Sequence, residues 1–99
     1  MTIYISLPIT NDPKAREKAD LIKASLSRKG HTPVSPFDVP AGKNPKYEDY
    51  ICGDLRAMLD CDGIIFCDGW EQSCGCNIEH DVAMRFKAYE RKDFKIMYE

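Results

Sequence analysis

The sequence predicts a small α/β three-layer sandwich, with four parallel strands and helices on both faces of the sheet. Short apolar segments alternate with longer segments whose apolar residues recur every three or four positions, and no internal repeat or linker interrupts this alternation. Strands that are separated by helices are joined by right-handed crossovers, which makes the sheet parallel. The chain has 99 residues, so we expect a single domain that spans residues 1–99.

The first third of the chain predicts two strands and one helix. Residues 3–5 form an apolar strand, and residues 11–13 (Asn-Asp-Pro) are typical of a helix start. Gly30 is typical of a helix end, and residues 31–34 predict a short strand whose proline favours the edge of the sheet. The apolar face of the helix is formed by Ala15, Ala19, Ile22 and Leu26.

The remaining elements follow a long, proline-containing loop over residues 35–45. We predict a second helix over residues 47–60, a third strand over 63–67, a third helix over 76–89 and a fourth strand over 94–98. The residues expected to face inward are Ile51, Leu55, Met58 and Leu59 in the second helix, and Ile78, Val82, Phe86 and Tyr89 in the third.

Composition and charge exclude several classes of function. The net charge of -2 gives no basic surface for nucleic acid, and the mixture of acidic and basic residues argues against a membrane surface. No apolar segment approaches membrane-spanning length, and the apolar N-terminal segment (residues 2–6) is too short and lacks the positive charge of a signal peptide. The five cysteines cannot pair completely within one chain, so we expect a reduced, cytoplasmic protein.

Glu79 is the first candidate for catalysis. It follows the third strand and a glycine-containing turn, in the predicted first turn of the third helix. The positive end of the helix dipole would keep its carboxylate ionised there. Such a group at the carboxyl end of a parallel strand suits a nucleophile or an electrostatic anchor, although a helix-start acid that merely answers the dipole is as plausible at this point.

Asp54 is the second candidate. It lies at the edge of the inward face of the second helix, so it is either a surface acid or a half-buried carboxyl with a raised pKa. A carboxyl of the second kind can give or take a proton. An ionised carboxylate beside a protonated one is the pairing used in retaining cleavage of glycosidic bonds.

The cysteines and the aromatic residues give weaker signals. A superficial metal set is formed by Cys67, Cys74, Cys76 and His80, but Cys-x-Cys is not a usual zinc spacing, and we expect neither a metal nor a cofactor. Tyr4 is most simply a core aromatic. Trp70, the one tryptophan, lies in a loop where it could stack on a base or pack at a subunit interface.

Several segments resemble the nucleoside 2-deoxyribosyltransferase-like superfamily, in particular its small phage and bacterial proteins. Residues 1–10 (MTIYISLPIT) are similar to the opening of these proteins, hIYISGPITG. Residues 61–66 (CDGIIF), 68–73 (DGWEQS) and 78–80 (IEH) are similar to a second pattern, CDAIhhLPGWExSxGAxxEHxxA. The resemblance extends from the first strand through the third helix and implies a Rossmann- or flavodoxin-like fold.

The resemblance also implies roles for individual residues. Glu79 matches the glutamate that attacks the anomeric carbon, and Asp54 matches the aspartate that handles the proton of the departing base. Tyr4 matches a tyrosine at the sugar, Ser73 a serine of a phosphate-binding turn, and Gly75 the glycine beside it. Leu7 differs from the family, which has a glycine in the first loop.

These observations predict an enzyme that cleaves or transfers the N-glycosidic bond of a (deoxy)nucleoside or nucleoside monophosphate. Catalysis is expected from Glu79 and Asp54. Substrate contacts are expected from Ser6, Pro8 and Trp70, which lie at the carboxyl ends of the strands. The resemblance implies further contacts from Tyr4, Ser73 and Gly75. The expected partner is a small nucleoside or nucleotide, and the resemblance implies a homodimer or larger homo-oligomer. The alternatives are a nucleotide-binding module of the same fold without turnover, and an interaction protein without a site.

Overall fold

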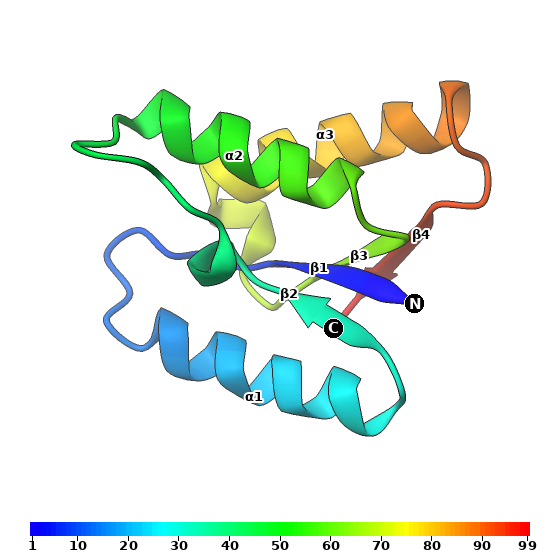
Figure 1. The fold of residues 1–99 in the computed structure, drawn as a ribbon, viewed down its shortest axis with the longest axis horizontal. Coiled ribbons are helices and arrows are strands. Elements are labelled where there is room, and N and C mark those ends of the chain that lie inside the picture. The colour runs from blue at the N-terminus through cyan, green and yellow to red at the C-terminus, as the bar shows by residue number, and fades with distance from the viewer.

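The computed structural model describes residues 1–99 and contains four strands and three α-helices (Figure 1). The strands are β1 (Thr2–Ser6), β2 (Thr32–Val34), β3 (Gly63–Phe66) and β4 (Lys95–Tyr98). The helices are α1 (Ala15–Arg28), α2 (Tyr47–Leu59) and α3 (Cys74–Tyr89), with short 3₁₀ turns η1 (Pro36–Asp38) and η2 (Trp70–Gln72).

All strand pairs are parallel, and the strand order is β2-β1-β3-β4. Helix α1 covers one face of the sheet, and α2 and α3 cover the other (Figure 1). The predicted α/β sandwich with a parallel sheet is therefore confirmed, as is the edge position of β2. The chain leaves β1 on one side to form β2 and returns on the other side to form β3, so the order reverses between β1 and β3. In open α/β sheets this reversal leaves a crevice beyond the carboxyl ends of the two strands, where ligands bind.

Strand β1 serves both layers because its side chains alternate between the two faces of the sheet. Ile3 and Ile5 pack in one buried cluster with Leu26 of α1. Tyr4 belongs to the other cluster, with Met58 of α2. Ser6 shares the face of Tyr4, because it is two residues further along the strand. A buried polar side chain is thereby brought under α3, next to the crevice.

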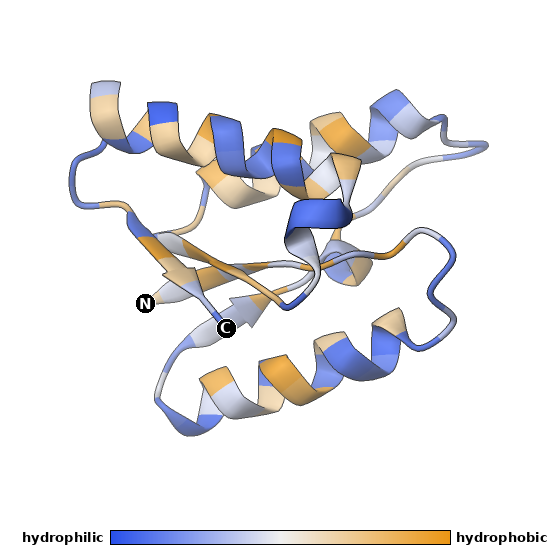
Figure 2. Cartoon of the chain, turned by 180° about the vertical axis from the view of Figure 1, so that it is seen from behind, coloured by the Kyte–Doolittle hydropathy of each residue, from blue (hydrophilic) through white to orange (hydrophobic).

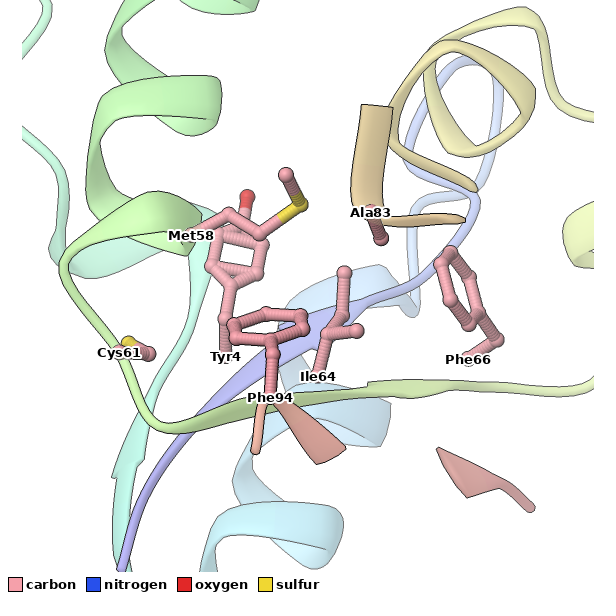
Figure 3. Close-up of a cluster of buried hydrophobic side chains, with 7 residues drawn as sticks. All are labelled: Tyr4, Met58, Cys61, Ile64, Phe66, Ala83 and Phe94. Atoms are coloured by element: carbon pink, nitrogen blue, oxygen red, sulfur yellow. The ribbon is translucent and has the colours of Figure 1, made fainter. Parts of the chain in front are cut away.

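The cluster under α2 and α3 forms the larger part of the core. Figure 3 shows the ring of Tyr4 rising from β1 toward Met58, beside Phe94 and Ile64, with Ala83 of α3 above the sheet. Apolar residues recur in the strands, most of all in β3, and alternate with polar residues along the helices (Figure 2). This pattern is typical of a parallel sheet buried on both faces between amphipathic helices.

The structure corrects some predicted boundaries. Helix α1 begins at Ala15, and the Asp12 carboxylate accepts the Lys14 N–H in the turn before it instead of capping the helix. Helix α3 begins at Cys74, two residues earlier than predicted, because Ser73 caps it. Tyr89, expected to face inward, is 79 % exposed, since the last turn of α3 extends past the sheet. None of the helices has the length and apolar character needed to cross a membrane.

Candidate functional site

A cavity of about 620 Å³ opens at the carboxyl ends of β1 and β3. Its walls come from four segments that are distant in sequence: the loop after β1, the turn η1 after β2, one face of α2 and the first two turns of α3. Both predicted catalytic carboxyls, Asp54 and Glu79, line this cavity. The topology of the sheet thus brings α2 and α3 together where the strand order reverses.

Glu79 is almost completely buried at the cavity floor. Its residue is 5 % exposed, and its Oε1 accepts a hydrogen bond of 2.7 Å from Ser6 Oγ, which is itself fully buried. Burial raises the pKa of the Glu79 carboxyl from its ordinary 4.5 to about 7, against the lowering effect of the Ser6 hydroxyl. A raised pKa of this size is typical of catalytic carboxyls.

The structure corrects the expected electrostatics of Glu79. Because α3 begins at Cys74, Glu79 is its sixth residue and lies in the second turn, beyond the strongest effect of the helix dipole. Its environment is governed by burial, so the carboxyl is more easily protonated than an exposed glutamate, whereas the sequence predicted a carboxylate held ionised by the dipole. The prediction of an ionised first-turn acid is wrong, although the residue still faces the crevice.

Tyr4 lies beneath Glu79. Its side chain is fully buried, and its hydroxyl lies beside the Glu79 carboxyl without a hydrogen-bond partner. Burial raises the pKa of Tyr4, and the nearby carboxyls of Glu79 and Asp54 raise it further. An unpartnered buried hydroxyl costs about 1–3 kcal/mol, so the fold keeps an unfavourable polar group at this position. Tyr4 does not line the cavity, and the same holds for Ser6: both contact Glu79 from behind.

Asp54 approaches the cavity from α2. It is half-buried, and burial raises the pKa of its carboxyl from 3.8 to about 6. The prediction of a half-buried carboxyl with a raised pKa is therefore confirmed. Its charge also raises the pKa of Glu79, which shows that the two groups interact. Near neutral pH, one proton is divided between two carboxyls that share a cavity.

Ser73 and Gly75 form the start of α3 and line the cavity. Ser73 is the N-cap residue, and its Oγ accepts the N–H of Cys76 at 3.2 Å. A Cβ placed on Gly75 would meet Ile51 Cδ1 at 3.6 Å and Tyr47 Oη at 4.0 Å, which is ordinary van der Waals contact. The fold itself would therefore accept a side chain here, and the glycine keeps this part of the cavity open.

Trp70 and Pro8 are predicted site residues that lie outside the cavity lining. The indole of Trp70 stacks on the imidazole of His80 with ring centroids 4.5 Å apart and contacts the rings of Phe66 and Tyr98. Trp70 is thus part of an aromatic cluster at the β4 side of the sheet. Pro8 packs against the turn at Gly69, where the backbone has φ +86°.

The cysteines and His80 differ in exposure and in their neighbours. Cys76 is buried and Cys74 is exposed, and His80 Nε2 lies 2.8 Å from Tyr98 Oη within the aromatic cluster. No three His, Cys, Asp or Glu side chains are grouped as ligands for a metal ion. Burial raises the pKa of the Cys76 thiol, which keeps it a neutral, unreactive group.

The sequence analysis missed the aromatic side chains at the cavity mouth. We call Phe37, Tyr47 and Tyr50 the aromatic rim; all three line the cavity, and the two tyrosines are 54 % and 50 % exposed. A signal was available in α2, because Tyr47, Tyr50, Ile51 and Asp54 follow the i, i+3, i+4, i+7 spacing of one helix face. Phe37 carried no such signal, since it lies in an irregular loop.

Fold and site together define a small α/β protein with a carboxylate-lined cavity at the reversal point of a parallel sheet. Comparison with protein families matches residues 1–89 to the family described as "Domain of unknown function (DUF4406)". The match covers most of the chain, which therefore belongs to this family. A search of curated proteins gave no match. The family assignment carries no activity, so the resemblance to nucleoside 2-deoxyribosyltransferases stays a prediction.

Proposed function

We propose that this protein cleaves or transfers the N-glycosidic bond of a nucleoside or nucleotide through a covalent intermediate on Glu79. One observation carries the proposal: Glu79 and Asp54 line the same cavity, both with raised pKa values. Two carboxyls that share a cavity and differ in environment are the machinery of glycosidic cleavage with retention. The cavity of about 620 Å³ has the size of a small-molecule site.

In the first step, a Glu79 carboxylate oxygen attacks C1′ of the sugar. The bond between C1′ and the base nitrogen breaks, its electron pair leaves with the base, and the Asp54 carboxyl donates its proton to that base. The products are a sugar ester on Glu79 and a neutral base. In the second step the Asp54 carboxylate takes a proton from water, or from a second base, whose nucleophilic atom displaces Glu79 from C1′.

Ser6 and Tyr4 support Glu79 from behind the cavity. The Ser6 hydroxyl fixes Oε1 by its hydrogen bond, which leaves the other carboxylate oxygen to attack. The Tyr4 hydroxyl has no partner in the resting site and can donate to the Glu79 carboxylate when Glu79 is ionised. Donors that are held in place before the reaction contribute to catalysis without a reorganisation cost.

The productive form of the site carries one proton, on Asp54. With pKa values of about 6 for Asp54 and about 7 for Glu79, the singly protonated pair dominates between these values. The proton resides more on Glu79 than on Asp54 in the resting site, so the reactive arrangement is the minor one. The higher basicity of Glu79 in turn favours it as the nucleophile once it is ionised.

Release of free base tests the proposal. The wild-type protein is incubated with a panel of deoxynucleosides, ribonucleosides and their 5′-monophosphates, and free base is measured by chromatography. Glu79→Gln, which keeps the shape and can still accept from Ser6, should abolish release. Glu71→Gln, an exposed glutamate near the start of the same helix, is the matched control and should retain the wild-type rate.

Two results would contradict the assignment. If Glu79→Gln still releases base at the wild-type rate, the nucleophile is another group. If substrates raise the melting temperature but no base is released by the wild-type protein, the site is that of a binding module without turnover. For the wild-type protein, a mass increase by one sugar residue after a rapid acid quench would identify the covalent intermediate.

A further inference from the structure

The cavity lining has a definite electrostatic character. Of the thirteen residues that line it, Asp54 and Glu79 are the acids, and none is basic. With one proton between the two carboxyls, the cavity carries a net negative charge. Seven of the thirteen are hydrophobic, and the aromatic rim is among them. A cavity of this kind attracts uncharged or positively charged ligands with apolar faces and repels anions, since charges at short range in a partly buried site interact strongly.

Three basic residues of α1 are engaged by other side chains of the protein. Arg16 of α1 lies with its guanidinium 4.6 Å from the centroid of the Phe37 ring, as a cation–π contact. Lys23 donates to both carboxylate oxygens of Asp38, at 3.0 and 2.9 Å. Lys18 pairs with Asp12 at 2.8 Å. These cations are held by side chains of the protein around the outside of η1 and α1, and none of them lines the cavity.

The start of α3 is also partly occupied by the protein's own groups. Helix N-termini bind phosphate through free backbone N–H groups. Here the Ser73 hydroxyl accepts the N–H of Cys76, and the Ser73 carbonyl accepts that of Asn77. A phosphate placed at this end of the cavity would also be close to the carboxylate of the same helix, Glu79, whose ionisation it would oppose.

We infer that the site takes an uncharged nucleoside and discriminates against its 5′-monophosphate, with the base stacked against the aromatic rim and the sugar turned toward Glu79. The inference deepens the proposed function and rests on it for the reaction. The exposed tyrosines offer flat, amphipathic surfaces at the mouth, and stacking on such rings is typical of base recognition. The negative charge of the floor supplies the discrimination, because a phosphate on the 5′ oxygen would bring two further negative charges into the cavity.

The test compares kcat/KM for one deoxynucleoside, its 5′-monophosphate and its 5′-O-methyl derivative, which adds bulk without charge. The expected result is a kcat/KM at least about tenfold higher for the nucleoside than for the monophosphate, with the 5′-O-methyl derivative close to the nucleoside. The preference should narrow as salt is raised, because electrostatic repulsion is screened. Equal use of the monophosphate, or rejection of the 5′-O-methyl derivative to the same extent, would overturn the inference.

Two variants make the test sharper. Arg16→Gln should leave the ratio of the two kcat/KM values unchanged; if it selectively impairs the monophosphate, Arg16 binds phosphate and the inference is wrong. Tyr50→Ala should raise KM for the nucleoside with little change in kcat. An unchanged KM would show that the base does not stack on Tyr50 of the aromatic rim.

Binding separates this inference from the proposed function. The affinity of Glu79→Gln for nucleoside and for monophosphate is measured by calorimetry. Preferred use of the monophosphate with release of base would overturn the inference while the proposed function stands. If the nucleoside binds more tightly than the monophosphate but the wild-type protein releases no base, the ligand class is supported and the proposed reaction is contradicted. Binding of neither would overturn the ligand class.

Discussion

At the scale of single residues, the protein places a carboxyl where water cannot solvate it well. Glu79 is buried, interacts with Asp54 and receives one hydrogen bond, from Ser6. Desolvation outweighs that hydrogen bond, so the pKa rises. The ionised form needed for attack is thus obtained at a cost in stability. Such a balance is common where activity requires an environment that the fold alone would avoid.

Glu79→Gln should stabilise the protein at alkaline pH. A carboxyl whose pKa is higher in the folded state than in the unfolded state destabilises the fold as pH rises from 4.5 to about 7, and the loss is complete above that window. The rise from 4.5 to about 7 corresponds to about 3 kcal/mol. Glutamine cannot ionise, so the free energy of unfolding of the variant relative to wild type should increase by about 2–3 kcal/mol between pH 4.5 and pH 8.

Urea denaturation of both proteins at the two pH values provides the measurement. The change with pH is the relevant quantity, because any packing difference of the amide acts equally at both values. A difference in unfolding free energy that does not change with pH would show that Glu79 has an ordinary pKa in the folded state.

Tyr4→Phe should separate stability from activity. The Tyr4 hydroxyl is buried without a partner, so its removal should leave the unfolding free energy within about 1 kcal/mol of wild type or raise it. If the hydroxyl supports Glu79 during attack, kcat for base release should fall by about tenfold or more. A thermal melt and a base-release assay on the same sample give the two readouts. A large loss of stability would instead show that the hydroxyl has a partner in the folded protein.

At the scale of elements, one strand and two helices build the site. Strand β1 supplies Ser6 on the face that lies under α3, while α2 and α3 each supply one of the two carboxyls. Helix α3 is set in place by its cap at Ser73, so that it begins at Cys74, two residues before the predicted start. Strand β1 is buried on both faces, and the inward faces of α2 and α3 that bury the core also carry the two carboxyls toward the crevice.

Gly63 of β3 and Gly75 of α3 have different roles, and alanine substitution should distinguish them. A Cβ at Gly63 would lie 2.6 Å from Lys95 O and 2.9 Å from Lys95 Cβ, so strands β3 and β4 would have to move apart. Gly63→Ala should therefore destabilise the fold by about 1–3 kcal/mol. Gly75→Ala, whose Cβ makes ordinary contacts, should melt within a few degrees of wild type but weaken ligand binding.

The pair is measured by thermal melting and by binding of the best substrate to each variant. Equal melting temperatures for Gly63→Ala and wild type would mean that the β3–β4 spacing relaxes freely. Full affinity in Gly75→Ala would mean that the ligand does not approach the start of α3.

At the scale of the whole molecule, the site exists because the strand order of the sheet reverses between β1 and β3. The order β2-β1-β3-β4 places the loops after β1 and β2 and the start of α3 around a single crevice. The carboxyls therefore act as a pair whose proton count depends on the cavity as a unit. Activity should follow that count.

The pH dependence of kcat/KM should be bell-shaped, with limbs near pH 6 and pH 7, the pKa values of Asp54 and Glu79. Below the window both carboxyls are protonated and the nucleophile is lost; above it both are ionised and the proton donor is lost. Asp54→Asn should remove the falling limb and lower kcat by about 10²–10⁴-fold. The limb that remains should report the ionisation of Glu79 alone, at a pH below about 7, since the Asp54 charge no longer raises the pKa of Glu79. A flat profile from pH 5 to 8 would contradict the one-proton site.

Much of the fold could be predicted from the sequence. Apolar periodicity predicted the boundaries of each strand and helix within a few residues, because burial of apolar faces dominates the stability of such elements. The edge position of β2 followed from its proline. The elements missed or misplaced have local causes: Ser73 extends α3, and Tyr89 lies past the end of the sheet.

The candidate site was predicted in part. Asp54 could be located from its position at the edge of a helix face, and Glu79 from its place after β3. The position of Trp70 could not be predicted, since a loop aromatic has no periodicity and its contacts with His80 and Tyr98 join segments distant in sequence. The aromatic rim was missed for the same reason at Phe37, which reaches the cavity only through the fold of η1.

The sequence by itself determined the alternation of strands and helices, the parallel sheet and the two candidate acids, Asp54 on a helix face and Glu79 after β3. These features depend on local periodicity and on the short connections of the chain. Only the tertiary structure decided the protonation of Glu79. The helix dipole, a local effect, favoured an ionised carboxylate, but the burial of Glu79 depends on distant segments, among them Ser6, which lies 73 residues away in the sequence. Desolvation arises from everything that surrounds a group, so the pKa is a property of the assembled fold.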